Sequence, residues 1–476
     1  MVSTLEYKTM TTQKEISTGK TPDIRKQNNN VFIQTFGCQM NKLDTELFTG
    51  LLIDNGYKIV NNIHDAGIIL YNTCSVRGHA EEKVYSHIGA LKSRKREEPD
   101  LIIGVLGCMA QKEGGKIFSR SPQVNLVCGT RMFDKLPDIL RSIPNNGKHV
   151  LAIEENQDFS IARTGNYNVN SFQAFVSIMR GCDNFCSYCI VPYVRGAEIS
   201  REIDDIVNEI KMLVENGSRE VTLLGQNVNS YGKGLKNGTN LAVLLRTISS
   251  IDKLERIRFI TSHPKDMTKD ILEAINELPK VCKYLHLPAQ SGSDQILKKM
   301  NRKYTSGYYR DLVNQAAELI PDISISSDFI VGFPGENEDD FQKTFKLMEE
   351  TRFFNCFIFK YSPRTGTTAS KFPDDVPEKT KKERNRILLD LQKNISKDKN
   401  RKQIGKTSNV LVEKLNTKAL TARPDEIRER NLPGNLFGRN EYNHIVIFDG
   451  TKDIIGKFVK VKIDDATDLT LFGHLN

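Results

Sequence analysis

The sequence predicts an α/β protein made of two consecutive strand–helix blocks and a small antiparallel β-barrel. In the first block, residues 31–146, short apolar runs such as GIILYNTC alternate with helical patterns, which is typical of strand–helix–strand units on a parallel sheet. In the second, residues 168–398, this rhythm recurs at least six times and indicates a partial or complete α/β (TIM-like) barrel. In the third, residues 401–476, alternating runs such as FVKVKIDD indicate the β-barrel.

The first 30 residues are polar and rich in Thr, Lys, Gln and Asn, and they lack an apolar stretch. They are expected to form a disordered extension and not a signal peptide. No apolar run approaches the roughly 20 residues that a membrane-spanning helix needs, so no membrane association is expected. The nine cysteines are therefore expected to be reduced thiols of a cytoplasmic protein. Grouped cysteines in such a protein indicate metal binding or catalysis.

The positive charge of the chain is concentrated in one segment. Lys and Arg exceed Asp and Glu by 68 to 59 overall, and eleven basic residues face four acidic ones between Glu378 and Lys406. Such a run is either the solvated face of a helix that joins two domains or a surface that contacts nucleic-acid phosphates. The sequence leaves both interpretations open.

Cys182, Cys186 and Cys189 follow the first strand of the second block with the spacing C-x3-C-x2-C. Three thiolates on one short loop can reach a single metal centre. A structural zinc site takes four ligands, usually as two spaced pairs, whereas three thiolates on a four-iron cluster leave one iron open to an external ligand. The alternatives are a zinc site completed by a distant histidine, or three unrelated buried cysteines.

Cys38, Cys74 and Cys108 each end an apolar strand of the first block, at intervals of about one strand–helix–strand unit. Adjacent parallel strands bring their C-terminal ends to one edge of the sheet, so the spacing predicts a second site of three thiolates. Cys128 also ends a strand and weakens the argument, because cysteine is common at buried positions.

Several motifs resemble known families over nearly the whole chain from Val31. RGCDNFCSYCIVPYVRG is similar to the signature of the radical-SAM superfamily, and IQTFGCQMNKLDTE, LLGQNVNSYG, HLPAQSGS and SSDFIVGFPGE are similar to methylthiotransferase motifs. GCQMN and the cysteine motif resemble the branch of tRNA-2-methylthio-N6-dimethylallyladenosine synthases. The third block resembles a TRAM domain, a small RNA-binding β-barrel.

The resemblance implies two 4Fe-4S clusters and S-adenosylmethionine as cofactors. It implies that the cluster that binds S-adenosylmethionine is held by Cys182, Cys186 and Cys189, and an auxiliary cluster by Cys38, Cys74 and Cys108. It places Tyr188 against the adenine of the cofactor and gives Cys128 no part. Gln226, Gln290 and Asp328 stand at strand ends where the cofactor is expected, although each could equally cap a strand or turn. No further catalytic residue is assigned.

The implied activity is methylthiolation of C2 of N6-isopentenyladenosine at position 37 of tRNAs that read codons beginning with U, with two molecules of S-adenosylmethionine. Besides tRNA, the implied partners are a flavodoxin-like or ferredoxin-like electron donor and iron–sulfur assembly proteins, and a monomer is expected. Related branches act on N6-threonylcarbamoyladenosine in tRNA or on an aspartate of a ribosomal protein. A non-enzymatic iron–sulfur RNA-binding sensor is an alternative of another class. Arg195, after the cysteine loop, is expected to meet a phosphate or carboxylate, or to form an ordinary surface ion pair.

Overall fold

The computed structural model describes residues 29–75, 78–143, 149–153, 163, 172–236, 238–416 and 435–476. They form two compact units. The first contains the described residues up to 163 together with Ile190–Ala197, and the second contains those from 172 to Cys189 and Glu198–Asn476. Most of the expected N-terminal extension lies outside the described residues. No described helix is both long and apolar enough to cross a membrane.

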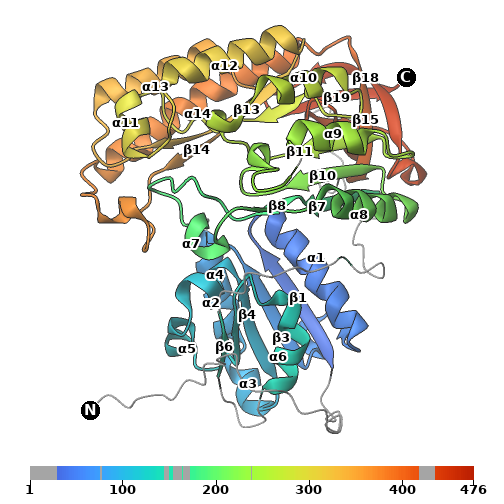
Figure 1. The fold of residues 1–476 in the computed structure, drawn as a ribbon, viewed down its shortest axis with the longest axis vertical. Coiled ribbons are helices and arrows are strands. Elements are labelled where there is room, and N and C mark those ends of the chain that lie inside the picture. Colours follow the sequence, from blue (N-terminus) through green and yellow to red (C-terminus); the bar gives the residue numbers. More distant parts are fainter. Residues whose placement is uncertain are drawn as a thin grey trace, which may run out of the picture. The chain divides into compact units, whose positions relative to one another are not determined.

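The first unit contains a six-stranded parallel sheet in the order β2-β1-β3-β4-β5-β6 (Figure 1). Its strands are β1 (Asn30–Phe36), β2 (Lys58–Ile59), β3 (Ile68–Thr73), β4 (Ile102–Gly107), β5 (Leu126–Cys128) and β6 (Val150–Ala152). The predicted parallel sheet is confirmed. Its last strand lies beyond residue 146, where the sequence placed the end of the first block, because β6 is only three residues long and follows the Pro- and Gly-containing break at residues 144–147 in the sequence.

Helices cover both faces of this sheet. They are α1 (Gln39–Asp54), α2 (Gly78–Ala90), α3 (Lys92–Glu97), α4 (Cys108–Glu113), α5 (Lys116–Arg120) and α6 (Leu136–Ser142). Successive strand residues point to opposite faces. Ile68 and Leu70 of β3 therefore pack in the core that contains α1 and α6, whereas Ile69 and Tyr71 pack in the core that contains α2, α4 and α5. This double burial explains the continuous apolar runs of the first block.

The second unit contains the six strands predicted for the central block, in two parallel groups ordered β7-β10-β11 and β12-β13-β14. They are β7 (Gln173–Ser177), β10 (Glu220–Leu224), β11 (Arg256–Phe259), β12 (Tyr284–His286), β13 (Ser324–Val331) and β14 (Asn355–Lys360). A parallel bridge between Ile257 and Val281 connects the groups. The helices between them are α8 (Ile203–Glu215), α9 (Leu241–Ser249), α10 (Lys269–Glu277), α11 (Asp294–Lys299), α12 (Ser306–Leu319) and α13 (Glu338–Thr351). This arrangement corresponds to the partial form of the predicted α/β barrel.

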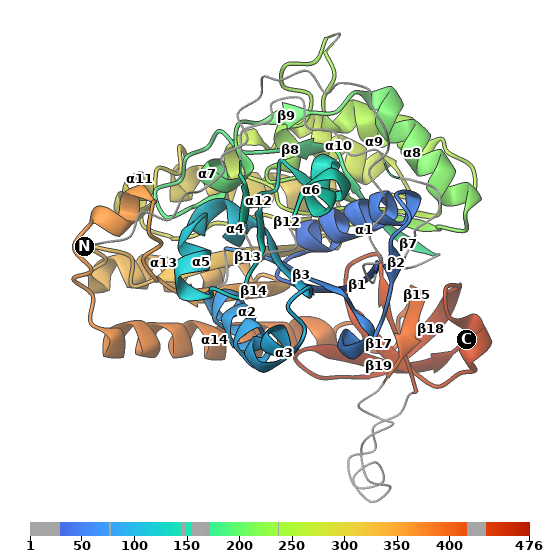
Figure 2. The same cartoon turned by 90° about the horizontal axis from the view of Figure 1, so that it is seen from below.

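A 24-residue helix, α14 (Glu378–Arg401), leads from these strands to the C-terminal barrel (Figure 2). The barrel is closed in the order β15-β16-β17-β19-β18. Its strands are β15 (Thr407–Leu415), β16 (Leu436–Asn440), β17 (Ile445–Phe448), β18 (Phe458–Ala466) and β19 (Thr470–Leu475). All neighbouring pairs are antiparallel except β17 and β19, which run parallel. The predicted small β-barrel is thus confirmed with one parallel pair.

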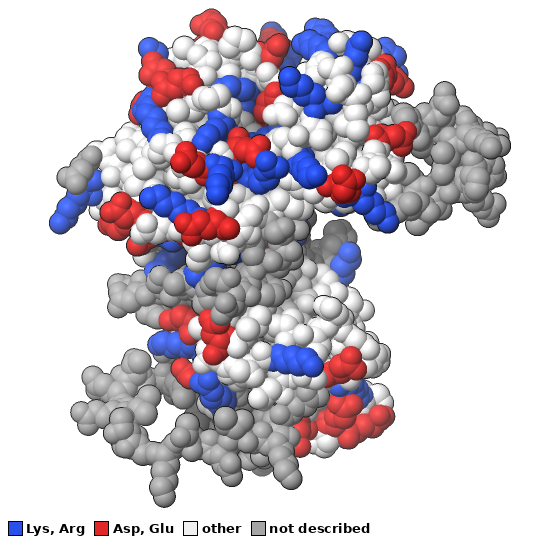
Figure 3. All heavy atoms as spheres, turned by 90° about the vertical axis from the view of Figure 1, so that its right-hand side faces the viewer, with Lys and Arg blue, Asp and Glu red and all other residues white. Residues whose placement is uncertain are grey.

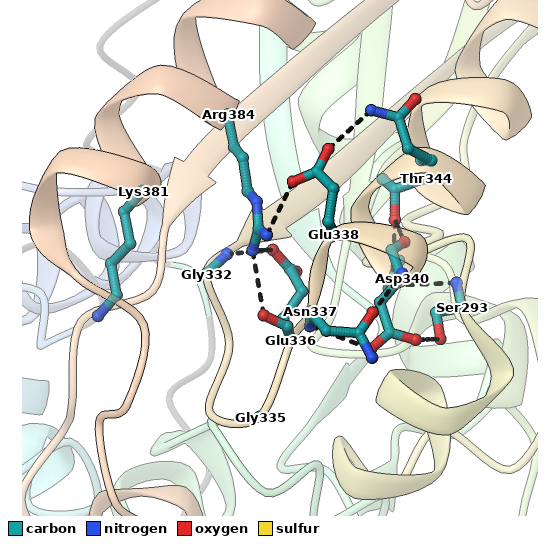
Figure 4. A network of polar contacts seen from close by, with 12 residues as sticks. Ser293, Gly332, Gly335, Glu336, Asn337, Glu338, Asp340, Thr344, Lys381 and Arg384 are labelled. Atoms are coloured by element: carbon teal, nitrogen blue, oxygen red, sulfur yellow. Dashed lines mark hydrogen bonds and ion pairs between the residues drawn. The ribbon is translucent and has the colours of Figure 1, made fainter.

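The basic residues between Glu378 and Lys406 do not form one exposed surface, because some of them are buried. Arg384 of α14 is buried, and its Nη1 donates to Oε1 of Glu336 at 2.8 Å while its Nη2 donates to Oε2 of Glu338 at 3.2 Å (Figure 4). Lys381 is buried as well and pairs with Asp374. Arg384 thus fastens α14 to the loop after β13 and to the start of α13, and Lys381 pairs with the segment just before α14, so neither cation is available to nucleic acid. Lys393 and Lys397, also on this helix, are exposed. On the face of the molecule in Figure 3, Lys and Arg are intermingled with Asp and Glu.

A buried carboxylate organises the junction between the central strands and the barrel. Oε2 of Glu220 accepts from Nε of Arg258 at 3.0 Å and lies 3.5 Å from Nη1 of Arg256. The arginines in turn donate to barrel carbonyls, Arg256 to Asn409 at 2.9 Å and Arg258 to Asn440 at 2.7 Å. Burial opposes the charge of Glu220, but the two guanidinium groups outweigh it and hold the pKa of this carboxyl below its usual value.

Replacing Glu220 with Gln is expected to lower the free energy of unfolding by about 3 kcal/mol, because it leaves two buried guanidinium groups without their counter-charge. Urea unfolding measures the effect. Glu255→Gln is the matched control, since Glu255 pairs with Arg219 at a far more exposed site and is expected to cost less than about 1 kcal/mol. Equal losses in the two variants would contradict the assignment of Glu220 to this junction.

Candidate functional site

Cys38, Cys74 and Cys108, here called the strand-end trio, lie at the C-terminal ends of neighbouring strands. Cys38 follows β1 after Gly37, Cys74 follows β3 directly, and Cys108 follows β4 as the first residue of α4. The three strands are hydrogen-bonded in the order β1-β3-β4. The fold therefore brings the three positions to one edge of the sheet, as the spacing predicts.

Two glycines make room at this edge. Gly37 has a φ of +125° and Gly107 a φ of +91°, conformations that favour glycine. A Cβ at Gly37 would lie 2.3 Å from Cβ of Cys74, and a Cβ at Gly107 would lie 2.3 Å from Oδ1 of Asn72. The close approach of the strand ends thus depends on the absence of side chains at both positions.

The strand-end trio lies beside a buried cation. Nε of Arg195 donates to Sγ of Cys108 at 3.2 Å, and its Nη2 donates to Oδ2 of Asp44 at 2.6 Å. The hydrogen bond from Cys74 lowers the pKa of the Cys38 thiol to about 6, and the Arg195 charge adds to this effect against burial. Burial raises the pKa of the Cys108 thiol. Because thiolates are the form that binds metal, the environment of Cys38 favours ligation.

Cys128 has a different environment. It ends β5, but its side chain is fully buried in the core that contains α1 and α6. Burial raises the pKa of its thiol well above the ordinary value. It is therefore a neutral core residue, in keeping with its exclusion from the trio.

Cys182, Cys186 and Cys189, here called the loop trio, lie on a loop that begins at the short strand β8 (Met179–Arg180). The loop is held by main-chain contacts. The amide of Cys189 donates to the carbonyl of Cys186 at 2.9 Å, and the amide of Ser187 donates to the carbonyl of Met300 at 3.0 Å. The thiol spacing is therefore fixed by turn geometry and by the end of α11.

Two side chains donate towards the loop trio. Nδ2 of Asn184 lies 3.4 Å from Sγ of Cys182, and Nη1 of Arg302 lies 3.5 Å from Sγ of Cys186. Arg302 is buried, and its Nη2 donates to the carbonyl of Pro288 at 2.8 Å. Donors of this kind stabilise a thiolate and orient it. No sequence pattern indicates this role for Arg302, because 116 residues separate it from Cys186.

The candidate cofactor residues near the loop divide into two kinds. Tyr188 packs against the apolar cluster of Ile296, Met300 and Phe333, and burial raises the pKa of its phenol. Gln226 is already engaged, because its Oε1 accepts from the amide of Gly181 at 2.5 Å. It therefore supports the start of the cysteine loop.

Gln290 lies four residues after the end of β12, whereas Asp328 lies within β13, three residues before its end, and not at the strand end where the sequence placed it. The amide of Gln290 donates to the carbonyl of Asp328 at 2.8 Å, and Gln290 has a φ of +70°. Among the described residues, Oε1 of Gln290 is buried without a hydrogen-bond partner. Oδ1 of Asp328 lies 3.0 Å from Nε2 of His286. Of the candidate cofactor residues, Gln290 thus presents the polar atom that most needs a ligand.

The donor chemistry of both trios fits an iron–sulfur cluster. Each supplies three thiols. Of the other three cysteines, Cys128 and Cys356 are buried in the two apolar cores, and Cys282 is buried as well. Within the described ranges, no three Cys, His, Asp or Glu side chains surround a point suited to one metal ion. A four-iron cluster instead takes each thiolate on a different iron, and three thiolates leave the fourth iron open.

Three family models match the chain. Residues 176–348 match the Radical SAM superfamily, residues 30–129 match the family described as "Uncharacterized protein family UPF0004", and residues 426–475 match the TRAM domain. The resemblances stated for the second and third blocks are thereby confirmed.

The chain is similar to curated proteins over nearly its whole length. It is 46% identical over 445 residues to the tRNA-2-methylthio-N(6)-dimethylallyladenosine synthase of Clostridium botulinum (strain Okra / Type B1), which covers 93% of this chain and 96% of that protein. It is 43% identical over 475 residues to the synthase of the same name from Acetivibrio thermocellus, covering 99% and 94%.

Solved structures show the same fold at low identity. The radical S-adenosylmethionine methyltransferase TsrM from Kitasatospora setae has a TM-score of 0.50 at 13% identity, covering 70% of this chain and 73% of that chain. The cobalamin-dependent S-adenosylmethionine radical enzyme OxsB has a TM-score of 0.51 at 16% identity, covering 77% and 56%.

Proposed function

Because this chain belongs to the family of tRNA-2-methylthio-N(6)-dimethylallyladenosine synthases, within the radical SAM superfamily, we propose that it methylthiolates C2 of N6-isopentenyladenosine at position 37 of tRNA. The observation that carries the proposal is the presence of two separate cysteine trios. The strand-end trio occupies one sheet edge of the first unit, and the loop trio lies in the second unit. A chemistry that both activates a carbon and inserts sulfur accounts for two such sites.

The loop trio would hold the 4Fe-4S cluster that binds S-adenosylmethionine, and the strand-end trio would hold the auxiliary 4Fe-4S cluster. When bound, the first cluster and S-adenosylmethionine supply a radical able to remove hydrogen from an unactivated carbon. Arg302 and Asn184 orient two sulfurs of the loop trio, while Gln226 fixes the amide of Gly181 before it.

Three residues are proposed to contact S-adenosylmethionine, and a fourth, Gln226, is proposed to support its site. Gln290 offers a buried oxygen that lacks a partner in the described part of the chain, which suits a donor group of the cofactor. Asp328 retains one oxygen beside its contact with His286. Tyr188 offers a ring at the base of the cysteine loop. Gln226 acts by holding that loop.

The barrel and α14 are proposed to contact tRNA. Lys457, Lys460 and Lys462 are exposed on or next to β18, and Lys393 and Lys397 are exposed on α14. Cations at such positions attract phosphates without reading sequence. The proposed further partners are a flavodoxin-like or ferredoxin-like electron donor and iron–sulfur assembly proteins, and the proposed form is a cytoplasmic monomer.

The test is nucleoside mass spectrometry after reaction of the anaerobically reconstituted protein with S-adenosylmethionine, a reductant and tRNA. We expect 2-methylthio-N6-isopentenyladenosine from tRNA that carries the isopentenyl group. The same tRNA with unmodified adenosine at position 37 is the control and is expected to give no product. Product formed only from tRNA that carries N6-threonylcarbamoyladenosine would overturn the substrate assignment.

A further inference from the structure

From the contacts of Arg195, we infer that this residue is a positioning residue for the auxiliary cluster. Its guanidinium binds one ligand sulfur, that of Cys108, and is itself held by Asp44. The inference rests on the proposed function, because it takes a cluster on the strand-end trio as given. It assigns to the segment after the cysteine loop a role in the other metal site.

The geometry fixes the guanidinium from two sides. The Nε–Sγ distance to Cys108 is 3.2 Å and the Nη2–Oδ2 distance to Asp44 is 2.6 Å. The side chains of Arg195 and Asp44 are only 10% and 12% exposed. A planar guanidinium with separate anchors on different nitrogens has little freedom to rotate, so its donor is aimed at the sulfur. The surface ion pair that the sequence left open for Arg195 is not what the structure shows.

The helix that carries Arg195 is held in the first unit by a hydrogen bond and by apolar packing. α7 (Val191–Arg195) begins two residues after Cys189, and Oγ1 of Thr130 donates to the carbonyl of Val194 at 2.9 Å. Ile190 and Val194 form an apolar cluster with Cys108.

Gly196 ends this helix with a φ of +78°. A Cβ there would lie 1.2 Å from Nη2 of Arg131, so another residue would strain the backbone and push aside the end of the Arg131 side chain. The position of Arg195 is therefore built by packing, a buried hydrogen bond and a required glycine.

The electrostatic consequence concerns electron affinity. Three thiolates make a four-iron cluster net negative, and reduction makes it more negative. A buried cation that donates to a ligand sulfur stabilises the reduced form more than the oxidised form and so raises the reduction potential. Asp44 opposes this effect with its negative charge but keeps the cation in place. Removing either charge should therefore shift the midpoint potential, and in opposite directions.

The test measures the midpoint potential of the auxiliary cluster by an EPR-monitored redox titration. The full-length parent protein carries Cys182→Ala, Cys186→Ala and Cys189→Ala, so that the loop trio contributes no signal. In this parent, Arg195→Met is expected to shift the midpoint to more negative values, and Arg195→Lys to give a smaller shift because the charge remains without the planar donor. Asp44→Asn is expected to shift it to more positive values.

Lys112→Met is the matched control. Lys112 lies on α4, as Cys108 does, and is a mostly buried cation paired with Glu81 and Glu113. Its loss is expected to leave the midpoint unchanged. A purely structural role of Arg195 would not produce shifts of opposite sign for Arg195→Met and Asp44→Asn.

The outcomes separate this inference from the proposed function. An unchanged midpoint in Arg195→Met, with iron and sulfide retained, overturns the inference and leaves the proposed function intact. If Arg195→Met cannot hold iron, Asp44→Asn decides, because a positive shift supports the inference and an unchanged midpoint overturns it. A parent protein that binds no iron on the strand-end trio overturns the proposed function itself.

Discussion

Replacing Cys74 with alanine is expected to abolish methylthiolation of tRNA while formation of 5′-deoxyadenosine continues. Cys74 ends the middle strand of the three that carry the strand-end trio and is 2% exposed. Its loss leaves two thiolates and a void where a buried cluster would need a third ligand. The loop trio lies in the other unit and keeps all its ligands. Iron should fall from about eight to about four atoms per chain.

Quantification of 2-methylthio nucleosides, of 5′-deoxyadenosine and of iron on one preparation measures all three effects. Cys128→Ala is the matched control, because it removes a buried thiol from the same unit without touching the trio. It is expected to lose some stability through a small cavity but to retain both iron and product. Thiolated tRNA from Cys74→Ala would show that the strand-end trio does not serve sulfur insertion.

The strand-end trio could be predicted because two simple rules act together. Each cysteine ends an apolar run, and the intervals match one strand–helix–strand unit, so the topology of a parallel sheet brings the positions to one edge. The apolar run of β3 likewise predicts a strand buried on both faces, and the structure places Ile68 and Ile69 in opposite cores. The need for glycine at positions 37 and 107 could not be predicted, because it depends on the atoms that lie against them in the folded structure.

The residues that support the sulfurs could not be predicted in the same way. Arg195 meets Asp44 across 151 positions of sequence, and Arg302 meets Cys186 across 116. Contacts of this range depend on tertiary packing and leave no periodicity. Arg195 does stand in a motif already marked by its cysteines, but the pattern could not distinguish an exposed ion pair from a buried one.

The sequence also does not predict which unit every segment belongs to. Ile190–Ala197 stands inside the second block by position, yet it belongs to the first unit. The reason is specific packing, since Ile190 and Val194 contact Cys108. A helix of five residues has too few apolar positions for the sequence to indicate which unit it packs against. The basic segment shows the same limit, because Arg384 and Glu336 become partners only once α14 lies on the loop after β13.

Replacing Cys186 with alanine is expected to abolish 5′-deoxyadenosine formation and methylthiolation together. Cys186 is the middle ligand of the loop trio, 9% exposed, and faces the buried guanidinium of Arg302. The variant removes a ligand, so that only two thiolates remain on the loop, and it also leaves that buried cation without its sulfur partner. Iron should again fall to about four atoms per chain, but now on the strand-end trio.

The matched control is Cys282→Ala, which removes a buried thiol from the same unit that is not a member of the loop trio. It is expected to keep both activities and all iron. The two cysteine variants therefore give the same iron count with different products, since Cys74→Ala still cleaves S-adenosylmethionine and Cys186→Ala does not. If both variants lost cleavage, the two trios would form one interdependent centre, and the division of radical chemistry and sulfur insertion between them would be wrong.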